Sequence, residues 1–299
     1  MKSKLYQDEN YLRYLHYELH MLPSEIAKMF DVSQSLIHHY FRKFGIEYDK
    51  TLSNLKHRKY QCDHYYFNVI DTPTQAYWLG FIMADGNIDN RKDRKNTHRL
   101  TIRLTKSDEH HLEKLNTVLN SNYEITYPKT EIKGKEYELA QLRINSSILC
   151  NGLIVNGIKP AKSCNEVFPY NTIPREYWKH FIRGVFDGDG CFSWWFDQDR
   201  YIPSCSFSLC GSQQLLLSCF TYIEYCTGVR IPKITKKDND LYTATIGGNF
   251  NVQKIMNWLY YGSSDENRLD RKYDKYHEFL EEYNNPRYDE YKRKSNVYV

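Results

Sequence analysis

The order of apolar and polar residues predicts a series of helices and strands that occurs twice along the chain. In the first copy, the predicted helix–strand–helix–strand–strand–helix series covers residues 76–88, 99–105, 107–120, 123–127, 136–145 and 146–155. In the second copy it covers residues 180–192, 204–209, 212–226, 229–236, 241–247 and 250–260, and a further helical segment follows at 266–283. A period of two indicates the strands, and apolar residues three or four apart indicate the helices. We therefore predict two α+β halves, each of about 100 residues, related by a pseudo-twofold axis.

Each copy begins with the same motif. AYWLGFIMADGNI at 76–88 and HFIRGVFDGDGCF at 180–192 both carry a glycine, a small residue four positions later, and then Asp-Gly. A spacing of four puts the small residues on one face of each helix. These small residues are Gly80, Ala84, Gly184 and Gly188. Because a glycine inside a helix costs about 1 kcal/mol relative to alanine, its repeated use indicates that the two helices pack closely.

The start of each motif helix also has a recognisable signal. Thr72 and Gln75 are spaced as a capping box, with Pro73 at the first helical position, and Pro174 opens the second copy in a similar way. At the other end, the glycine of each Asp-Gly step allows the chain to turn sharply from the helix into a strand.

The packed pair of helices brings two carboxylates, Asp85 and Asp189, to one end of the interface. Two ionised carboxylates repel each other unless a cation neutralises them. Oxygen ligands without Cys or His suit Mg²⁺, which keeps several waters and often binds phosphate oxygens as well. The alternative is that both aspartates merely cap or turn helix ends, but the same frame in both copies argues against it.

Residues 1–50 lie outside the repeat, and LPSEIAKMFDVSQSLIHHYFRKFGI at 22–46 has the pattern of a helix-turn-helix. Ser24 is predicted to cap the first helix and Ser33 the second, which covers residues 34–44 with Ile37 and Phe41 on its buried side. The second helix of a DNA-binding unit of this kind enters the major groove. The exposed residues predicted to contact DNA are Ser33, Gln34, Ser35, His38, His39 and Arg42. A small helical interaction module is the alternative.

Composition narrows the class of protein. The chain has 299 residues with a mean hydropathy of −0.71, and its longest apolar stretch is shorter than the roughly 18 residues of a membrane span. The N-terminus lacks the apolar core of a signal peptide, so we expect an intracellular protein without a membrane partner. The cysteines lack a CxxC pair and are expected to be reduced thiols.

The net charge is only +4, but the basic residues are clustered. Segments 50–60 and 229–237 contain no acid, and segment 91–106 contains one, Asp93. Such clustering indicates a basic face for a polyanion, most simply nucleic acid; solvated loops are the alternative. The residues of these clusters predicted to contact DNA are Arg91, Lys92, Arg94, Lys95, Arg230, Lys233, Lys236 and Lys237.

The predicted strands also carry a polar face each. Residues 99–105 alternate between apolar and polar side chains, and residues 136–145 and 204–209 do the same. Arg, Gln and Asn can make bidentate contacts with guanine or adenine, although any one polar face can also simply be solvated. The strand residues predicted to contact DNA are Arg99, Thr101, Arg103, Gln141, Arg143, Asn145, Ser204, Ser206 and Ser208.

The segments WLGFIMADG and IRGVFDGDG resemble the two signatures of the LAGLIDADG homing endonucleases, in the single-chain form with both motifs. Over about residues 65–284, this resemblance implies two αββαββα halves that form a DNA-binding saddle. It implies metal-dependent double-strand cleavage of a long asymmetric target that leaves short 3′ overhangs, with metal held at Asp85 and Asp189 and at the preceding Ala84 and Gly188. Met83 stands where the signature has an acid, which Asp187 supplies in the second copy, so we expect this departure to affect packing more than chemistry.

The resemblance also implies basic residues near the scissile phosphates. GIKPAKSCN at 157–165 and NRLDRKYDKY at 267–276 resemble the segments that supply them, and Lys162 and Lys272 are the residues carried over. Such a lysine stabilises the charge that builds up on the transferring phosphate.

We therefore predict a monomeric endonuclease that uses Mg²⁺, with Mn²⁺ as a possible substitute, on double-stranded DNA and with no obligate protein partner. The predicted organisation is a helix-turn-helix domain at 1–50, a basic linker at 51–71, LAGLIDADG halves at 72–166 and 167–284, and a polar tail at 285–299. Two alternatives remain on the same fold: a transcriptional regulator that does not cleave, and a maturase that binds intron RNA.

Overall fold

The computed structural model describes residues 4–48, 57–90, 98–132, 134–160, 165–196, 202–238 and 240–288. The chain divides into two compact units, residues 1–61 and 62–299. Each unit has its own hydrophobic core, and each is described by itself below.

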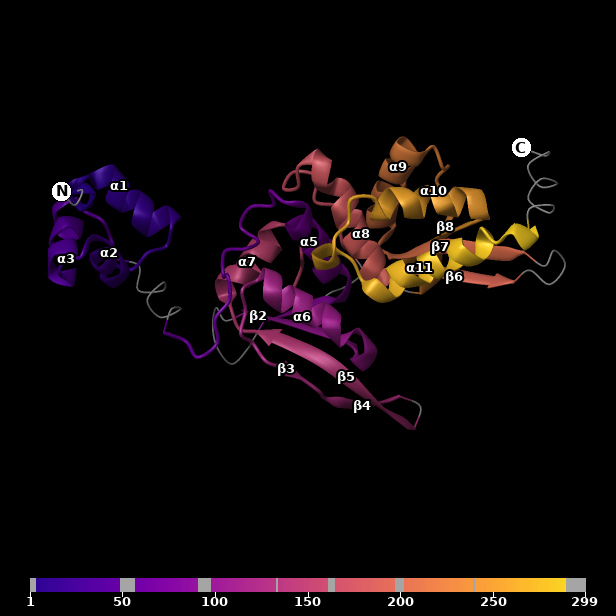
Figure 1. Ribbon diagram of the computed structural model, residues 1–299, viewed down its shortest axis with the longest axis horizontal. Helices are drawn as coiled ribbons and strands as arrows, with labels where there is room; N and C mark the ends of the chain where they lie inside the picture. Colours follow the sequence, from indigo (N-terminus) through magenta and orange to yellow (C-terminus); the bar gives the residue numbers. More distant parts are fainter. Residues whose placement is uncertain are drawn as a thin grey trace. The chain divides into compact units, whose positions relative to one another are not determined.

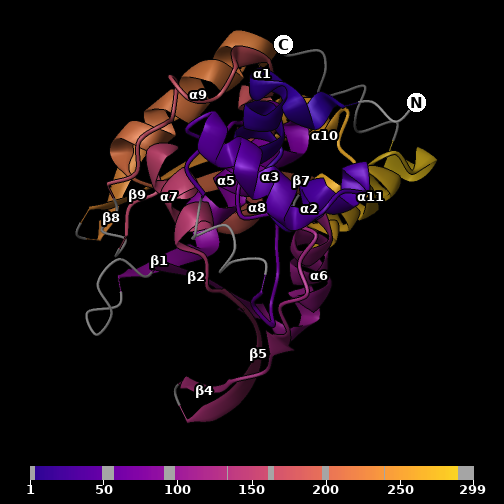
Figure 2. The ribbon, with the colours of Figure 1, turned by 90° about the vertical axis from the view of Figure 1, so that its left-hand side faces the viewer.

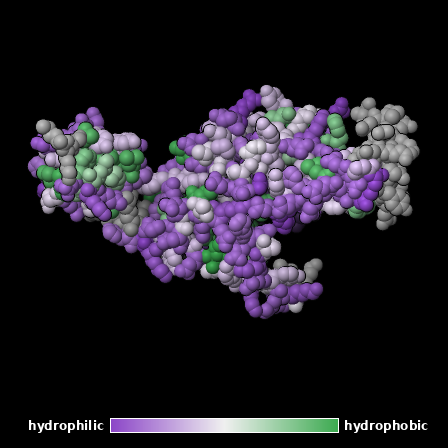
Figure 3. Space-filling view, viewed as in Figure 1, coloured by the Kyte–Doolittle hydropathy of each residue, from purple (hydrophilic) through white to green (hydrophobic). Residues whose placement is uncertain are grey.

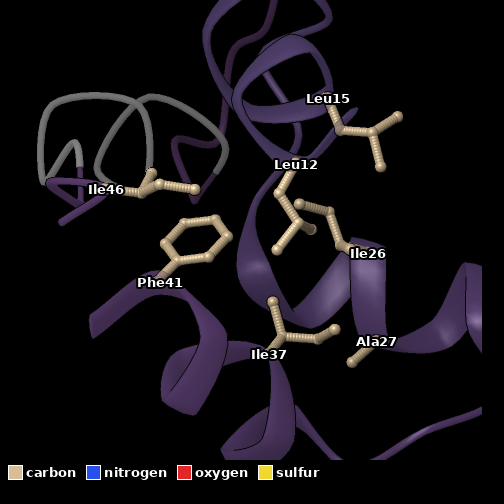
Figure 4. Close-up of a cluster of buried hydrophobic side chains, with 7 residues drawn as sticks. All are labelled: Leu12, Leu15, Ile26, Ala27, Ile37, Phe41 and Ile46. Atoms are coloured by element: carbon tan, nitrogen blue, oxygen red, sulfur yellow. The ribbon is translucent and has the colours of Figure 1, made fainter. Parts of the chain in front are cut away.

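The first unit is a small bundle of short helices. Its elements are η1 (Leu5–Gln7), α1 (Glu9–Arg13), the π-helical turn η2 (Tyr14–Glu18), α2 (Pro23–Phe30) and α3 (Gln34–Lys43). Figure 4 shows its core side chains, which come from α1, η2, α2, α3 and the segment after α3. They are Leu12, Leu15, Ile26, Ala27, Ile37, Phe41 and Ile46. The helix-turn-helix pattern is therefore completed by an N-terminal helix that periodicity alone did not identify.

The caps of the helix-turn-helix agree with the sequence at α3 but not at α2. The Ser33 hydroxyl accepts a hydrogen bond from Leu36 N at 3.2 Å, so Ser33 caps α3 as predicted. The prediction that Ser24 caps the first helix is wrong, because α2 already begins at Pro23 and Leu22 N donates to the Glu25 carboxylate at 2.7 Å. Proline at the first helical position has no N–H that needs a cap, so the start moves one residue upstream.

The second unit consists of two halves with the same order of elements. The first half contains α5 (Pro73–Asp85), β1 (Gly86–Asn90), β2 (His98–Thr105), η3 (Lys106–Asp108), α6 (Glu109–Val118), β3 (Ile125–Thr126), β4 (Lys129–Ile132), β5 (Lys135–Ile144) and α7 (Ser147–Val155). The second half contains η4 (Arg175–Tyr177), α8 (Trp178–Asp189), β6 (Gly190–Phe196), β7 (Pro203–Gly211), α9 (Gln213–Thr227), β8 (Ile234–Asp238), β9 (Leu241–Gly247), α10 (Asn249–Tyr260), η5 (Asp265–Asn267), α11 (Asp270–Tyr283) and η6 (Pro286–Tyr288). The predicted α+β class with two pseudo-symmetric halves is confirmed.

The two antiparallel sheets have the same strand order and register. The first runs β1-β2-β5-β3, with β4 also paired to β5, and the second runs β6-β7-β9-β8. The first residue of β1, Gly86, pairs with Ile102, and the first residue of β6, Gly190, pairs with Leu209. Figures 1 and 2 show the helices on one side of the sheets, and contacts of α6 and α7 with the first sheet and of α9, α10 and α11 with the second agree. The other face of each sheet is therefore left for solvent or a ligand.

Helices α5 and α8 form the centre of this unit. Residues 76–84 of α5 and 180–187 of α8 are all buried, because each helix contacts the other as well as its own half. Thr72 and Gln75 form the predicted capping box, with Thr72 Oγ1 accepting from Gln75 N at 3.2 Å. In the second copy, Pro174 instead precedes the 3₁₀ turn η4, and α8 begins after it.

Residues 62–71, the later part of the predicted linker at 51–71, belong to the second unit. Phe67 and Ile70 are buried, and His64 Nδ1 lies 2.8 Å from the Ser146 hydroxyl at the start of α7. Figure 3 shows mostly hydrophilic residues on the face of this unit that is in view. Within the described ranges, no helix has both the length and the apolar character that crossing a membrane requires.

Candidate nuclease site

The two motif helices meet at their glycines, as predicted. A Cβ atom placed on Gly80 would lie 2.1 Å from the Phe181 carbonyl oxygen, and one on Gly184 would lie 2.0 Å from that of Tyr77. Non-bonded atoms cannot approach each other this closely, so only glycine allows this crossing. Small size is thus required at both positions because helix backbone lies directly opposite.

The same contact continues to the C-terminal ends of the helices, where the acids stand. A Cβ atom on Gly188 would lie 2.2 Å from Ala84 Cβ and 3.3 Å from Asp85 Oδ2. The Asp85 carboxylate therefore lies against the residue that precedes Asp189. Asp85 is half-buried and Asp189 is exposed, so solvent reaches both residues.

The donor atoms at this place suit a hard cation shared with a substrate. The described part of the chain has no group of three or more His, Cys, Asp or Glu side chains placed to hold a metal. Two carboxylates fit Mg²⁺, which commonly takes one or two protein carboxylates and fills its remaining positions with water and phosphate oxygens. The residues present therefore fit the metal that the sequence implies, provided that the substrate completes the site.

Lys272 reaches the same helix end from α11, but its ammonium group faces the backbone. Its Nζ donates to the carbonyl oxygens of Phe186, Asp187 and Gly190 at 2.7, 2.8 and 2.6 Å. Burial lowers the pKa of Lys272, while Asp187 and Asp85 oppose that shift. A cation is favourable at a helix C-terminus, and these contacts fix the backbone on both sides of Asp189. The other predicted lysine, Lys162, lies outside the described residues.

Asp187 is buried inside the protein, unlike Asp189 at the end of the same helix. Its carboxylate accepts from the hydroxyls of Tyr77 and Tyr260, both at 2.9 Å, and from Leu269 N at 2.8 Å. Burial raises the pKa of Asp187, and Lys272 and these donors act against that shift. Met83, at the equivalent position of α5, is also buried. The signature acid that the first copy lacks is therefore a packing residue in the second copy.

The open face of the first sheet carries arginines next to Asp85. A hollow of about 400 Å³ is lined by Asp85, Asn87, Asp89, Arg99, Thr101, Arg103 and Arg143. The pairing of Asn87 with Thr101 and of Thr101 with Arg143 puts these side chains on one face. Thr101 is only 6% exposed, and its hydroxyl has no hydrogen-bond partner among the described residues. A polar hollow with three arginines and two carboxylates, those of Asp85 and Asp89, has more positive than negative side chains and is suited to a phosphate-bearing ligand.

Family comparison agrees with this geometry. The model of the LAGLIDADG-like domain matches residues 72–151, which span α5 and the sheet that carries the arginines. The half after this segment repeats its motif and its strand register. A search of curated proteins finds no significant match.

Solved structures similar to this chain include three complexes with DNA. I-SmaMI bound to uncleaved DNA target in the presence of calcium ions is 14% identical over 71% of this chain and 90% of that chain, with a TM-score of 0.47. The LAGLIDADG homing endonuclease I-GzeII in complex with its DNA target is 13% identical over 70% and 89%, with a TM-score of 0.47. The meganuclease I-AabMI bound to uncleaved DNA is 16% identical over 63% and 83%, with a TM-score of 0.38.

Within residues 72–151, two of the predicted DNA contacts, Thr101 and Gln141, are buried. Gln141 is only 2% exposed, its Oε1 accepts from Arg103 Nε at 2.7 Å, and its Nε2 donates to Thr126 Oγ1 at 3.1 Å. Its side chain therefore supports Arg103 and does not reach a groove itself. Arg103, Arg143 and Asn145 are exposed, as a DNA contact requires.

The remaining residues predicted to contact DNA differ in their exposure to solvent. In α3, His38 is half-buried, with Gln34 Nε2 3.2 Å from its Nε2, and the other predicted residues of this helix are exposed. In the second sheet, Ser204, Ser206 and Ser208 are half-buried on the open face of β7. The exposed basic residues in and before β8 are Arg230, Lys233, Lys236 and Lys237. Those outside the described residues are Arg91, Lys92, Arg94 and Lys95.

Two polar residues of the hollow, Asn87 and Asp89, were missed by the sequence reasoning. Both lie on β1, directly after Asp85 and Gly86. The alternation in Gly86–Asn90 was the available signal, because Ile88 between them is buried and its neighbours must face the other way.

Proposed function

We propose that this chain is a site-specific DNA endonuclease of the homing type, which makes double-strand breaks in a long asymmetric target and leaves short 3′ overhangs. The observation that carries the proposal is the placement of Asp85 and Asp189. The two acids come from equivalent positions of a duplicated motif and emerge together from a glycine-mediated helix crossing, next to an arginine-lined sheet face. Because one chain carries both copies, we expect the enzyme to act as a monomer.

The acids provide anionic oxygen ligands for a divalent cation, Mg²⁺ or its substitute Mn²⁺, and the carbonyls of the preceding residues, Ala84 and Gly188, join them. When bound, such a cation lowers the pKa of a bound water and stabilises the leaving oxygen. Lys272 acts as a positioning residue in this scheme, because its hydrogen bonds hold the backbone that presents Asp189. Lys162 stays a proposed basic residue of the other half.

The arginines beside Asp85 and the exposed lysines of β8 provide the positive charge that phosphates require. The helix-turn-helix of the first unit extends the target, with the exposed side chains of α3 in the major groove. Neither of these roles depends on the acids, so binding and cleavage can be separated by mutation.

Substitution of the acids tests the proposal most directly. Asp85→Asn and Asp189→Asn each remove an anionic ligand while they nearly preserve shape. DNA affinity should therefore survive, whereas cleavage should fall by at least about 100-fold, because a neutral amide holds Mg²⁺ poorly. The measurement is the conversion of supercoiled plasmid carrying a selected target to nicked and linear products. Nicked product alone from one variant would assign that acid to one strand.

The matched control is Asp274→Asn, the same change at an exposed position of α11, which should cut like the unaltered protein. Linear product at the unaltered rate from either acid variant would remove that acid from the site. Specific DNA binding by the unaltered protein without any cleavage in Mg²⁺ or Mn²⁺ would instead favour a transcriptional regulator. Tighter binding of structured intron RNA than of DNA would favour a maturase.

Removal of residues 1–50 tests the helix-turn-helix. Target binding should weaken and its dependence on salt should decrease, because phosphate contacts are lost. Metal-dependent cleavage should persist at high enzyme concentration, since the acids lie in the second unit. An unchanged affinity and salt slope would mean that the first unit contacts no DNA.

A further inference from the structure

The open faces of the two sheets can be compared position by position, because their registers are the same. Gly86 pairs with Ile102 as Gly190 pairs with Leu209, and Ile102 pairs with Leu142 as Leu209 pairs with Ala244. The open-face residues of β1, β2 and β5 that are compared with the second sheet are Asn87, Asp89, Arg99, Thr101, Arg103, Gln141 and Arg143. Their respective equivalents in the second sheet are Cys191, Ser193, Ser206, Ser208, Cys210, Thr243 and Thr245.

The first sheet has long, charged side chains on its open face where the second sheet has short, uncharged ones. Each arginine of the first sheet has a serine, cysteine or threonine as its equivalent, and the acid Asp89 has Ser193. Long side chains with several donors can span a groove and reach the edges of bases, whereas side chains that end at their γ atoms cannot make a bidentate contact at that reach. The two faces therefore differ in their capacity to distinguish one base pair from another, although their backbones are alike.

One arginine of the first sheet is held in place by an acid. Asp89 and Arg99 are direct cross-strand partners, and Arg99 Nη2 donates to Asp89 Oδ2 at 3.1 Å. The other oxygen of Asp89 accepts from Asn87 Nδ2 at 2.7 Å. The guanidinium is therefore oriented before a ligand arrives, and less side-chain entropy is lost when it binds.

The presence of Asp89 is informative because a carboxylate opposes the approach of DNA phosphates. On a surface that served only to attract DNA, this acid would lower affinity without a benefit. An oriented arginine explains it, because Arg presents two donors to O6 and N7 of guanine and because a repulsive group can increase discrimination while it reduces affinity.

We propose that sequence discrimination is concentrated in the half-site that lies on the first sheet, and that Arg99, positioned by Asp89, requires a guanine there. The inference rests on the proposed DNA-binding function but not on cleavage. The second sheet contributes affinity, because the shape of its backbone fits the duplex and the lysines of β8 contact phosphates. It tolerates many sequences in its half-site. Loss of the guanine contact should reduce discrimination at one base pair by roughly 5- to 150-fold.

The test is a selection of bound sequences from a randomised duplex library, carried out without metal so that cleavage plays no part. For the full-length protein, one half of the selected site should be well defined and contain an essential guanine, and the other half should be loosely defined. Equally defined halves, or no sequence preference at all, would overturn the inference. A defined site that the protein binds but does not cut in Mg²⁺ would count against the nuclease proposal alone.

Two substitutions assign the guanine. Arg99→Gln should remove the guanine preference in the well-defined half, because Gln pairs with adenine rather than guanine. Asp89→Ala should weaken the same preference while affinity for unrelated DNA does not fall, a combination that a merely structural ion pair would not produce. A uniform loss of affinity in Arg99→Gln, with unchanged selected sequences, would make Arg99 a phosphate contact and overturn the proposal.

A gain-of-function variant completes the test. Ser193 and Ser206 are direct cross-strand partners, as Asp89 and Arg99 are. Ser206→Arg combined with Ser193→Asp should therefore introduce a guanine preference in the loosely defined half. The matched control, Ser206→Arg alone, should increase affinity with less preference, because its guanidinium is not held. Selected sequences identical to those of the unaltered protein in the double variant would count against orientation by the acid.

Discussion

The two motif helices share their glycines but differ in polarity at three equivalent buried positions. In α5 these positions hold Ala76, Leu79 and Met83, all apolar, whereas the equivalents in α8 are His180, Arg183 and Asp187. Every one of these six residues is buried. The same backbone crossing is thus supported by an apolar core on one side and by a buried polar network on the other.

In the polar network, each guanidinium nitrogen of Arg183 has a hydrogen-bond partner. Arg183 donates from Nε to the Asn267 carbonyl at 2.8 Å, from Nη1 to the Leu259 carbonyl at 3.0 Å, and from Nη2 to Asn267 Oδ1 at 2.6 Å. Together with the bond from Leu269 N to Asp187, these contacts fix the segment between α10 and α11 against α8. In the first half, the ε-methyl of Met83 instead lies near Gly157, in the segment that follows α7.

The difference teaches which parts of the motif are constrained by the helix crossing. The glycines face another backbone, so nothing larger fits. The three other positions accept either an apolar or a polar residue, provided that an apolar residue meets apolar neighbours or that a polar residue finds a complete set of partners. The variable acid of the motif is therefore a matter of packing, and the acid that both copies keep stands at the helix end.

The shared feature should be the most sensitive to change. Gly184→Leu places a side chain where Cβ alone would lie 2.0 Å from the Tyr77 carbonyl, so we expect a loss of more than about 4 kcal/mol and no folded second unit. Thermal unfolding followed by circular dichroism measures this. The control is Gly247→Ala, because that glycine has nothing within 4 Å of its Cβ position. An unchanged melting temperature in Gly184→Leu would contradict the helix crossing.

The next change makes α8 resemble α5. Asp187→Met leaves the hydroxyls of Tyr77 and Tyr260 and the N–H of Leu269 without their acceptor inside the protein. We expect a loss of about 3–5 kcal/mol in the free energy of unfolding, measured in urea.

The matched control for Asp187→Met is Met83→Leu, at the equivalent position of α5. This exchange of similar volume should cost less than about 1.5 kcal/mol. Equal losses in the two variants would mean that the two sides of the crossing do not differ in the way described.

These contrasts also explain which features could be predicted from the sequence. The duplication, the strand faces and the glycine contact depend on local periodicity and on residue size, and both are visible in the chain itself. The two acids were found because their frame repeats. The partners of Asp187, and those of Arg183 other than His180, could not be predicted, because they lie more than 70 residues away and their proximity results from tertiary packing.

Tertiary packing also explains why the roles of two predicted site residues were wrong. Gln141 has the right chemistry to contact a DNA base, and Lys272 the right chemistry to contact a phosphate. Only the structure shows that both are buried, with Gln141 bonded to Arg103 and Lys272 bonded to the backbone at the end of α8. Asp89 was missed for the opposite reason, since an acid does not fit the expectation of a basic face. Its meaning becomes visible only beside Arg99.

The smallest expected effect concerns pH and His180, which replaces Ala76 of the first copy. His180 Nδ1 lies 2.9 Å from Arg183 Nη2 and must accept from it, so the ring is neutral in the folded state. Burial, with Arg183 and Lys179 nearby, lowers the pKa of His180 from 6.5 to about 3. Between those values the unfolded chain binds a proton that the folded protein does not, so this residue's contribution to stability is present above pH 6.5 and decreases as the pH falls.

His180→Gln keeps an acceptor for Arg183 but cannot titrate. We therefore expect the variant to lose less stability than the unaltered protein between pH 7 and pH 5, by at most about 1.4 kcal/mol per pH unit. Urea unfolding of both proteins at each pH measures the difference, and carboxylates common to both cancel in it. Parallel pH profiles would mean that His180 is protonated in the folded protein, and that the polar side of the crossing has a different hydrogen-bond arrangement from the one described.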